Sequence, residues 1–387
     1  MKLETIRLGE VMDVKHGYPF ESEFYADSGE YILLTPGNCY ETGGLRLKGD
    51  KEKYFTGEFP SEYLLNEGDM LVVMTDLINR APILGGSFLI PESNKYLHNQ
   101  RLGLVKVTDE ARIDRMFLYY LLNTHDYRGQ VRGSASGATV RHTSPDRIKA
   151  CRVRVPKDVG HQRRIGLALA AYDTLIENNR RRMKLLEDAA RLLYQEWFVR
   201  LRFPGHERVR IRSGVPEGWE AKPIGESAPF HYGKALKEND RRDGTVPVYG
   251  SSGIVGWHEK ALVDGPGIVV GRKGNAGSVF WSDSPFWPID TVYYVASEAS
   301  THYLYHCLGQ VPFQSTDVAV PGLNRTYAHS LKILWPSGTM RDEFEFAVRP
   351  MYQQMTKLRG MNSKLRAARD LLLPRLMSGE IELAGAS

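Results

Sequence analysis

Five loops of the sequence carry side chains that can read the edges of DNA base pairs. Arginine and lysine donate to guanine, asparagine and glutamine pair with adenine, and serine or histidine can serve several bases. The loops are HNQR (98–101), RGSASGATVRH (132–142), YGSSG (249–253), GRKGNAG (271–277) and LNRTY (323–327). The candidate contacts are Asn99, Gln100, Arg101, Arg132, Ser134, Ser136, Arg141, His142, Ser251, Ser252, Arg272, Lys273, Asn275, Asn324, Arg325 and Tyr327. Since half or more of protein–DNA contacts go to the sugar-phosphate backbone, a single member is expected to meet phosphate or solvent more often than a base.

Several of these residues could instead have a purely structural role. The glycine spacing of GRKGNAG does not fit a dinucleotide-binding loop, and no clear helix follows it. We expect Gly271, Gly274 and Gly277 to provide turn geometry that exposes the polar residues between them. A plain solvated hairpin is the alternative. Asn99 and Asp290 both suit buried turns, and the apolar setting PFWPIDTVYYV favours that role for Asp290.

Catalytic motifs are missing from the sequence. It contains no NPPY-like or DPPF-like tetrapeptide for gripping a flipped adenine, no GxxxxGK[ST] loop for ATP and no HExxH pair. Cys39, Cys151 and Cys307 are far apart, and the histidines lack metal-ligand spacing. We therefore predict no catalytic residue, no metal and no cofactor in this chain.

Composition sets broad limits on the class of protein. The chain has 387 residues, 42% hydrophobic and 25% charged, which is enough for two or three globular domains. The net charge of +5 favours polyanionic partners only weakly. No run of about 18 apolar residues predicts a membrane span, and the N-terminus lacks an apolar signal segment, so we expect a cytoplasmic protein.

The chain divides into four pieces in the order globular, helix, globular, helix. Short apolar runs bounded by Gly, Pro, Asn and Asp fill residues 1–157 and the region after the linker, as expected for strands and turns. One clear helix, around 115–123, interrupts the first region. The predicted boundaries are 1–157 for the first domain, 158–201 for a central helix, 202–338 for a linker and the second domain, and 339–387 for a C-terminal helix and tail.

Both predicted long helices carry an apolar seam in alternating steps of three and four residues, which is the heptad pattern of a coiled coil. The central seam includes Ile165, Leu169, Tyr172, Ile176, Met183, Leu186, Leu193 and Trp197. The C-terminal seam includes Met351, Met355, Leu358, Leu365, Leu372 and Leu376. Polar Asn179, Asn362 and Arg369 fall on the same seams. Pro374 and Gly379 mark the end of the second helix.

The two halves read as a diverged internal repeat. A shift of 179 residues superimposes the two seams, and GDMLVV (68–73), MFLYYLLN (116–123) and TVRHTSPDRIK (139–149) match GPGIVV, HYLYHCLG and GLNRTYAHSLK in the same order. A heptad helix cannot bury its seam alone, so each helix needs a partner. We expect the two to pair antiparallel. About 35 residues make a rod of roughly 50 Å, which corresponds to about 15 base pairs.

The sequence resembles a known family along its whole length. The run AYDTLIENNRRRMKLLEDAARLLYQEWFVRLRFPGHE is similar to the central conserved region of the specificity subunit of type I restriction-modification enzymes. GRKGNAGSVFWSDSPFWPIDTVYYV, and GDMLVVMTD together with HNQRLGLVKV, are similar to parts of that family's target-recognition domains. The resemblance implies an α+β protein: two mixed α/β target-recognition domains, separated by two long helices that pack as an antiparallel coiled coil, with pseudo-two-fold repetition.

The resemblance also implies a function. It predicts a non-catalytic, sequence-specific DNA-binding subunit that reads a bipartite, asymmetric target, with the helices as a ruler. It implies docking to two modification (methyltransferase) subunits and to restriction (motor and nuclease) subunits, with S-adenosylmethionine, ATP and Mg²⁺ bound by those partners. Two alternatives stay open. A single-chain restriction and methyltransferase enzyme would transfer methyl groups alone, and a coiled-coil scaffold would not discriminate bipartite from scrambled duplexes.

Overall fold

The computed structural model describes residues 2–313 and 322–383. The chain forms two compact units. Unit 1 comprises Met1–Glu177 and Asn362–Ser387, and unit 2 comprises Asn178–Met361. Both divisions fall inside a long helix, so each helix contributes one end to each unit. The boundaries predicted from the sequence lie at the ends of the long helices, where the residue pattern changes. The compact units divide the chain differently, because each unit includes the helix segments against which its globular part packs.

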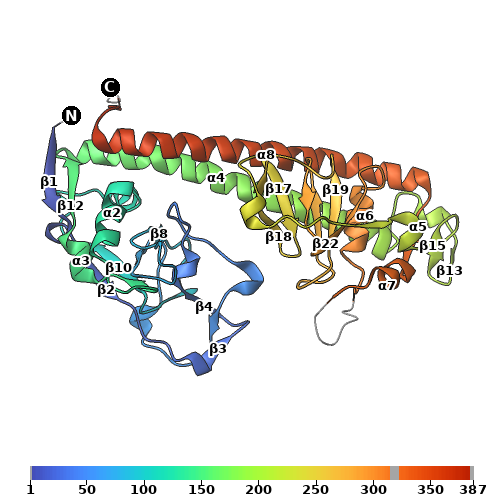
Figure 1. Cartoon of the computed structure of the whole chain (residues 1–387), viewed down its shortest axis with the longest axis horizontal. Helices are drawn as coiled ribbons and strands as arrows, with labels where there is room; N and C mark the ends of the chain where they lie inside the picture. Colours follow the sequence, from blue (N-terminus) through green and yellow to red (C-terminus); the bar gives the residue numbers. More distant parts are fainter. Residues whose placement is uncertain (1, 314–321, 384–387) are drawn as a thin grey trace. The chain divides into compact units, whose positions relative to one another are not determined.

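Two long helices, α4 (Val159–Tyr194) and α8 (Gly338–Ser378), match the predicted heptad segments (Figure 1). A single π-helical turn, Gln195–Val199, extends α4. Helix α8 continues through Pro374 and ends just before Gly379, whose φ of +79° lies in the left-handed region that glycine tolerates.

Unit 1 is built around a four-stranded antiparallel sheet in the order β2-β10-β6-β8. A pair of antiparallel strands, β1-β12, leads into α4, and a second sheet has the order β3-β5-β4-β9 with β4 and β9 parallel. The bounds are β1 Leu3–Arg7, β2 Met12–His16, β3 Tyr25–Ala26, β4 Tyr31–Leu34, β5 Tyr54–Phe55, β6 Met70–Val73, β7 Thr75–Asp76, β8 Ser87–Leu89, β9 Tyr96–His98, β10 Leu102–Val107, α1 Arg115–Leu121, α2 His125–Ser134, β11 Arg141–His142, α3 Pro145–Ala150 and β12 Arg152–Pro156.

Unit 2 repeats this plan. Its four-stranded sheet has the order β16-β22-β19-β20, β15 pairs with β23, and β17 lies between β18 and the parallel β21. The bounds are β13 Ile211–Arg212, β14 Val215–Pro216, β15 Glu220–Pro223, α5 Ile224–Ser227, β16 Phe230–Tyr232, β17 Val246–Gly250, β18 Gly253–His258, β19 Gly267–Gly271, β20 Val279–Ser282, β21 Trp287–Pro288, β22 Val292–Val295, α6 His302–Leu308, α7 Arg325–Ser330 and β23 Lys332–Trp335.

Strand register confirms the internal repeat and corrects its alignment. In unit 1, Val105 pairs with Val14 and Met70, and in unit 2 Val295 pairs with Phe230 and Ile268. Each of these two sets lies in the core that also contains residues of the long helices. Met70 therefore corresponds to Ile268, one residue beyond the glycine that the sequence match set against it. The correction matters because a slip of one residue moves every side chain of a strand to the opposite face.

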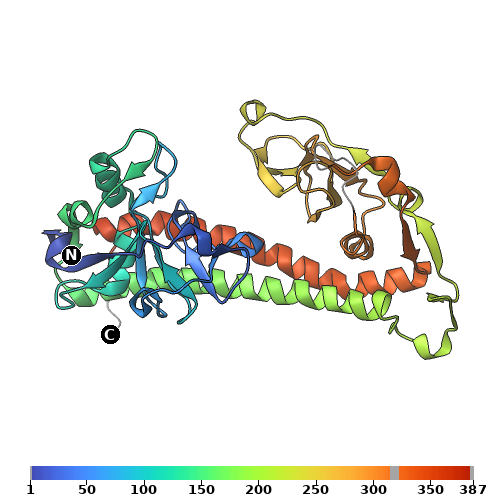
Figure 2. The same ribbon diagram turned by 90° about the horizontal axis from the view of Figure 1, so that it is seen from below.

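Within each unit, the segments of α4 and α8 run antiparallel, as the sequence predicted (Figures 1 and 2). In unit 1, Asn362 Nδ2 donates to the Ile176 carbonyl at 3.2 Å, while Leu376 lies in one core with Ile165 and Leu169. In unit 2, the Phe344 ring contacts those of Tyr194 and Phe198. All of the predicted seam residues are buried or half-buried.

The seam also merges with the core of each globular part. Ile165 and Leu169 share their core with Phe117 of α1, and Phe198 shares its core with Tyr303 of α6. Phe198 is 5% exposed and is missing from the heptad prediction, which placed only Trp197 at this level. The π-helical turn adds a residue to the helical repeat and so brings Phe198 inward. Among residues 2–313 and 322–383, every helix is too short or too polar to span a lipid bilayer.

Candidate nucleic-acid interface

Two of the predicted loops of unit 1 meet at one stretch of backbone, Met74–Asp76. The Met74 amide donates to the Arg101 carbonyl at 3.0 Å, and the Met74 carbonyl accepts from the Thr143 amide at 2.9 Å. Beyond this point β7 pairs with β11, which sets His142 against Thr75. We call this meeting of loops 98–101 and 132–142 at Met74–Asp76 the first joint.

Side chains at the first joint divide into supporting and presented groups. The half-buried Arg141 guanidinium donates to the carbonyls of Arg132 and Ala135 at 3.0 and 3.3 Å, so it shapes the loop from within. His142 is exposed, and its Nδ1 lies 3.1 Å from Thr75 Oγ1. Ser134 and Ser136 are also exposed, whereas Arg132 is half-buried. Loop 132–142 therefore presents hydroxyl and imidazole groups at its surface.

Asn99 takes the turn-forming role rather than a DNA-facing one. Asn99 is only 7% exposed, and its Oδ1 accepts a hydrogen bond from the Arg101 amide at 3.0 Å. The adjacent Gln100 and Arg101 are exposed. We therefore omit Asn99 from the candidate interface and retain its two neighbours.

Unit 2 contains an equivalent joint. The amides of Arg272 and Lys273 donate to the Thr291 carbonyl at 2.9 and 3.0 Å, and the Arg272 carbonyl accepts from the Leu323 amide at 2.8 Å. An isolated antiparallel bridge between Lys273 and Gly322 takes the place of the β7–β11 pair. We call this meeting of loops 271–278, 288–291 and 322–327 the second joint.

The glycine-rich loop at the second joint behaves as the sequence predicted. Gly274 and Gly277 have φ of +76° and +81°, and a Cβ on Gly271 would lie 2.1 Å from the Asn275 carbonyl oxygen. Ser278 Oγ donates to the Ser251 carbonyl at 2.7 Å, which brings the loop containing Ser251 and Ser252 alongside. Lys273, Asn275 and Ser252 are exposed. The prediction for Asp290 was wrong: it lies in a turn but is exposed, because it sits at the rim of the joint and not under the strand that follows it.

The sequence prediction missed Tyr232, an exposed aromatic residue at the end of β16. The guanidinium carbons of Arg272 and Arg325 lie 5.0 and 4.6 Å from the centre of its ring. The remaining predicted residues of this loop are more structural. Asn324 Oδ1 caps α7 by accepting from the Tyr327 amide at 3.1 Å, and Tyr327 is half-buried against the core of unit 2. The only sequence signal for Tyr232 was an aromatic residue in the strand sequence FHY, which core packing explains equally well.

Positive charge is concentrated at the second joint. Within residues 2–313 and 322–383, neither Arg272 nor Arg325 forms an ion pair with a carboxylate. The pKa of His329 is lowered by burial and further by the positive charge of Arg325. An unneutralised cationic surface beside an exposed ring attracts a polyanion that also offers flat apolar faces.

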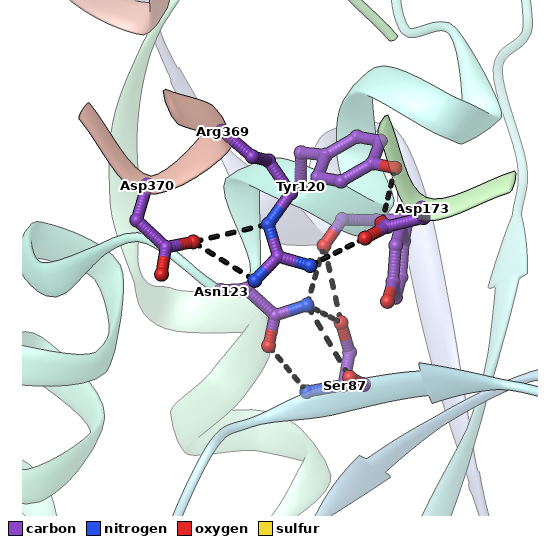
Figure 3. A network of polar contacts seen from close by, with 7 residues as sticks. Ser87, Tyr120, Asn123, Asp173, Arg369 and Asp370 are labelled. Atoms are coloured by element: carbon purple, nitrogen blue, oxygen red, sulfur yellow. Dashed lines mark hydrogen bonds and ion pairs between the residues drawn. The ribbon is translucent and has the colours of Figure 1, made fainter. Parts of the chain in front are cut away.

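A polar cluster links the helix pair of unit 1 to its globular part (Figure 3). Arg369 of α8 forms an ion pair with Asp173 of α4, and Asp173 accepts from the Tyr120 hydroxyl of α1 at 2.7 Å. Asn123, just after α1, exchanges hydrogen bonds with Ser87 of β8. The cluster thus connects two helices, α1 and the central sheet of unit 1.

Unit 2 makes the corresponding connection with different groups. The Tyr352 hydroxyl of α8 lies 2.9 Å from His306 Nε2 of α6, and Glu345 accepts from His302 Nδ1 and the Tyr303 amide at 2.8 Å each. Offsets of 179 residues along the helices and 186 along α1 and α6 make Tyr352 the counterpart of Asp173 and His306 that of Tyr120. The two globular parts are therefore fastened to their helices at equivalent places by unlike chemistry.

Catalytic geometry does not emerge at either joint. Among the described residues, no group of three His, Cys, Asp or Glu side chains is placed to hold a metal ion. A cavity of about 440 Å³ in unit 1 is lined by Cys39, Tyr40, Asp76, Ile78 and others. Both Asp76 oxygens already accept backbone amides, from Ile78 and Ile83, and burial raises the pKa of the Cys39 thiol to about 12, so neither is a reactive group.

A duplicated scaffold with unlike polar loops at equivalent joints is the arrangement expected of a protein that recognises DNA in two parts. Comparison with known proteins agrees. The chain belongs to the type I restriction-modification DNA specificity family, whose model matches residues 2–188 and 216–332. It is a specificity subunit, which binds DNA within a type I complex; the methylating and cleaving activities of such complexes belong to other subunits.

Relatives are distant but extend over most of the chain. The specificity subunit of the type I restriction enzyme MjaIX from Methanocaldococcus jannaschii is 22% identical over 343 residues, 79% of this chain and 77% of its own. A putative type I specificity subunit from Mycoplasma pneumoniae is 25% identical over 256 residues, 63% of this chain and 58% of its own. The crystal structure of a type I S subunit from M. genitalium has the same fold, with a TM-score of 0.57 at 18% identity over 97% of this chain and 96% of that one.

Proposed function

We propose that this specificity subunit reads a bipartite, asymmetric DNA sequence, with each joint reading one half. The observation that carries the proposal is the repetition of one backbone arrangement with different side chains. The Met74 and Arg272 carbonyls accept equivalent hydrogen bonds, from Thr143 and Leu323. Around these points the first joint presents one guanidinium group, one amide, two hydroxyls and an imidazole, whereas the second presents two guanidinium groups, an ammonium group and an amide. Unlike donor sets read unlike base pairs.

The candidate contacts in this proposal are the exposed polar residues of the two joints. At the first joint they are Gln100, Arg101, Ser134, Ser136 and His142, and at the second they are Lys273, Asn275 and Arg325. To these we add Ser252 of the adjacent loop and the half-buried Arg272, whose guanidinium group lies against the exposed Tyr232 ring. Arg132, Arg141, Ser251, Asn324 and Tyr327 are half-buried or engaged in shaping the loops, so they support the contacts rather than make them.

We further propose that the paired helices set the spacing between the half-sites. The support is that both α4 and α8 run without a break from one unit into the other. Inserting one heptad at matching points of both helices lengthens each by about 10 Å, so the preferred spacer should grow by about three base pairs. An unchanged spacer would refute the ruler while leaving the half-site assignment intact.

The helices and globular parts together are proposed to dock two modification subunits, and through them restriction subunits. S-adenosylmethionine, ATP and Mg²⁺ belong to those partners in this proposal. Twofold repetition of the scaffold supports it, because two copies of one partner need two similar docking surfaces.

The experiment combines co-expression of the chain and modification subunits with sequencing of methylated sites. A motif of two fixed halves around a non-specific spacer is the expected result. Replacing residues 215–336 by those of another family member should change one half only; a change in both halves, or in neither, would contradict the assignment. Incubation of the chain alone with labelled S-adenosylmethionine and DNA tests the enzyme alternative, for which transfer without partners is the decisive result.

A further inference from the structure

The second joint carries a cluster that the first joint lacks: the Tyr232 ring with the Arg272 and Arg325 guanidinium groups around it. Tyr232 is 48% exposed, so the ring is accessible and the cluster lies at the surface. Its second neighbour is Tyr293, with ring centres 5.2 Å apart, and the Arg272 guanidinium carbon is also 5.8 Å from the Tyr293 ring. Tyr293 is 1% exposed, and its hydroxyl donates to the Leu323 carbonyl at 2.8 Å, so this ring is fixed from below.

Internal repetition shows that the cluster is not needed to build the fold. Strand register makes His16 the counterpart of Tyr232, since these residues pair with Gly103 and Tyr293 at equivalent points. Backbone hydrogen bonds make Met74 the counterpart of Arg272. The first residues of α3 and α7, each following a side-chain N-cap, make Pro145 the counterpart of Arg325. Unit 1 thus forms the same joint with histidine, methionine and proline.

The two positive charges of the cluster are not balanced by a carboxylate of the described chain. Two guanidinium groups share one ring, and no carboxylate of the described chain neutralises either. Arg272 uses one donor on the Asp290 carbonyl, at 3.1 Å, which leaves the rest of its planar fork available. An aromatic face supports a guanidinium group without consuming its in-plane donors.

We propose that Tyr232 holds Arg272 and Arg325 as a pair of guanine-reading forks, so that the half-site read by unit 2 contains guanine at the positions they meet. A planar fork fits the O6 and N7 acceptors of guanine in the major groove with two parallel hydrogen bonds. Base reading needs a fork of fixed orientation, whereas a phosphate contact tolerates a mobile one. Fixing an arginine on a ring removes part of its rotamer entropy before DNA arrives. Tyr232 is thereby a positioning residue and the arginines are specificity-determining residues. This inference rests on the proposed function.

The test replaces each member by the residue that unit 1 uses at the same place, because unit 1 shows that the scaffold accepts it. The variants are Tyr232→His, Arg272→Met and Arg325→Pro, each assembled with modification subunits and assayed by sequencing methylated sites from a randomised duplex library. Tyr232→Phe retains the ring, and Arg325→Lys retains the charge without the fork. The matched control is Arg242→Met, which removes an exposed arginine of the same unit that pairs with Glu259 at 3.3 Å.

Each arginine variant should relax discrimination at a G·C pair of one half-site by about tenfold to a hundredfold, with the other half-site unchanged. Arg325→Lys should behave like Arg325→Pro, Tyr232→His should relax the same positions less strongly, and Tyr232→Phe and Arg242→Met should read as wild type. The chimera of residues 215–336 assigns the affected half-site to unit 2.

Two results would overturn the inference alone. A uniform loss of methylation across all sequences, restored by Arg325→Lys and by low salt, would make the arginines phosphate contacts. A wild-type half-site without any guanine on either strand would exclude the forks directly. Absence of a bipartite motif from the wild-type complex would instead remove the proposed function, and the inference with it.

Discussion

Loss of the Asp173 carboxylate should destabilise unit 1 and leave unit 2 unchanged. Asp173 accepts from the buried Tyr120 hydroxyl and pairs with Arg369, whose side chain is 16% exposed. Removing one member of a fully buried pair costs about 3–5 kcal/mol. The Asp173 side chain keeps 32% of its surface exposed and Arg369 retains Asp370, so we expect the lower end, about 3 kcal/mol, for Asp173→Ala. Asp173→Asn keeps an acceptor for Tyr120 and should cost about 1–2 kcal/mol.

Hydrogen exchange followed by mass spectrometry separates the two units. Amides of β6 and β10 report on unit 1, and those of β19 and β22 report on unit 2. All six tryptophans lie within 178–361, so tryptophan fluorescence during denaturant unfolding provides a second reading of unit 2 alone. Some amides of β6 and β10 exchange only when unit 1 unfolds globally. In Asp173→Ala we expect these amides to exchange roughly a hundredfold faster than in the wild type. The midpoint of the fluorescence transition, which reports on unit 2, should not shift.

Two further variants test whether the cluster around Asp173 stabilises unit 1 locally. Asp370→Ala removes the exposed partner of Arg369 and should cost under about 0.5 kcal/mol. The double variant Asp173→Leu with Arg369→Leu should be less destabilised than Asp173→Ala, because no unpaired charge is left on the seam. Equal losses in both units, or a double variant worse than the single one, would show that the cluster does not act as a local fastening of unit 1.

Three further predictions concern the seam, acid stability and the glycine-rich loop. Asn362→Ala should lower the free energy of unfolding by about 1 kcal/mol, because the hydrogen bond from Asn362 Nδ2 to the Ile176 carbonyl, which joins the two long helices, is lost; a more stable variant in denaturant melts would contradict this. Burial lowers the pKa of both His98 and His306 to about 4, against about 6.5 when unfolded. The unfolded chain therefore binds more protons between these values, so stability is full above pH 6.5 and falls towards pH 4, by up to about 3 kcal/mol per histidine; His306→Gln should flatten the profile of tryptophan-monitored melts, and an unaltered slope would exclude His306 as a cause. Gly271→Ala should weaken DNA binding through the second joint, because its Cβ would overlap the Asn275 carbonyl oxygen; gel shifts unchanged from wild type would show that the loop adapts.

Periodic patterns explain why the long helices were predictable. A seam repeated over many turns averages out local exceptions, so Asn179, Asn362 and Arg369 did not obscure it. The antiparallel pairing followed from the repeat, because two copies of one amphipathic helix are each other's economical partners. The single deviation, Phe198 turned inward by a π-helical turn, depends on Tyr303 and Phe344, which are distant in the chain. No local periodicity could reveal it.

The polar loops could be identified from the sequence, but the role of each residue in them depends on the tertiary structure. Asn99 and Gln100 are neighbours with similar side chains, yet one bonds its own turn and the other faces solvent. Arg141 and Arg325 are both arginines in recognition loops, yet the first supports backbone carbonyls and the second stacks on Tyr232. Residue type specifies which hydrogen bonds a side chain can make. Which of these hydrogen bonds form depends on backbone carbonyls and aromatic rings that belong to other strands and loops. Only the folded chain brings these groups within bonding distance of the side chain.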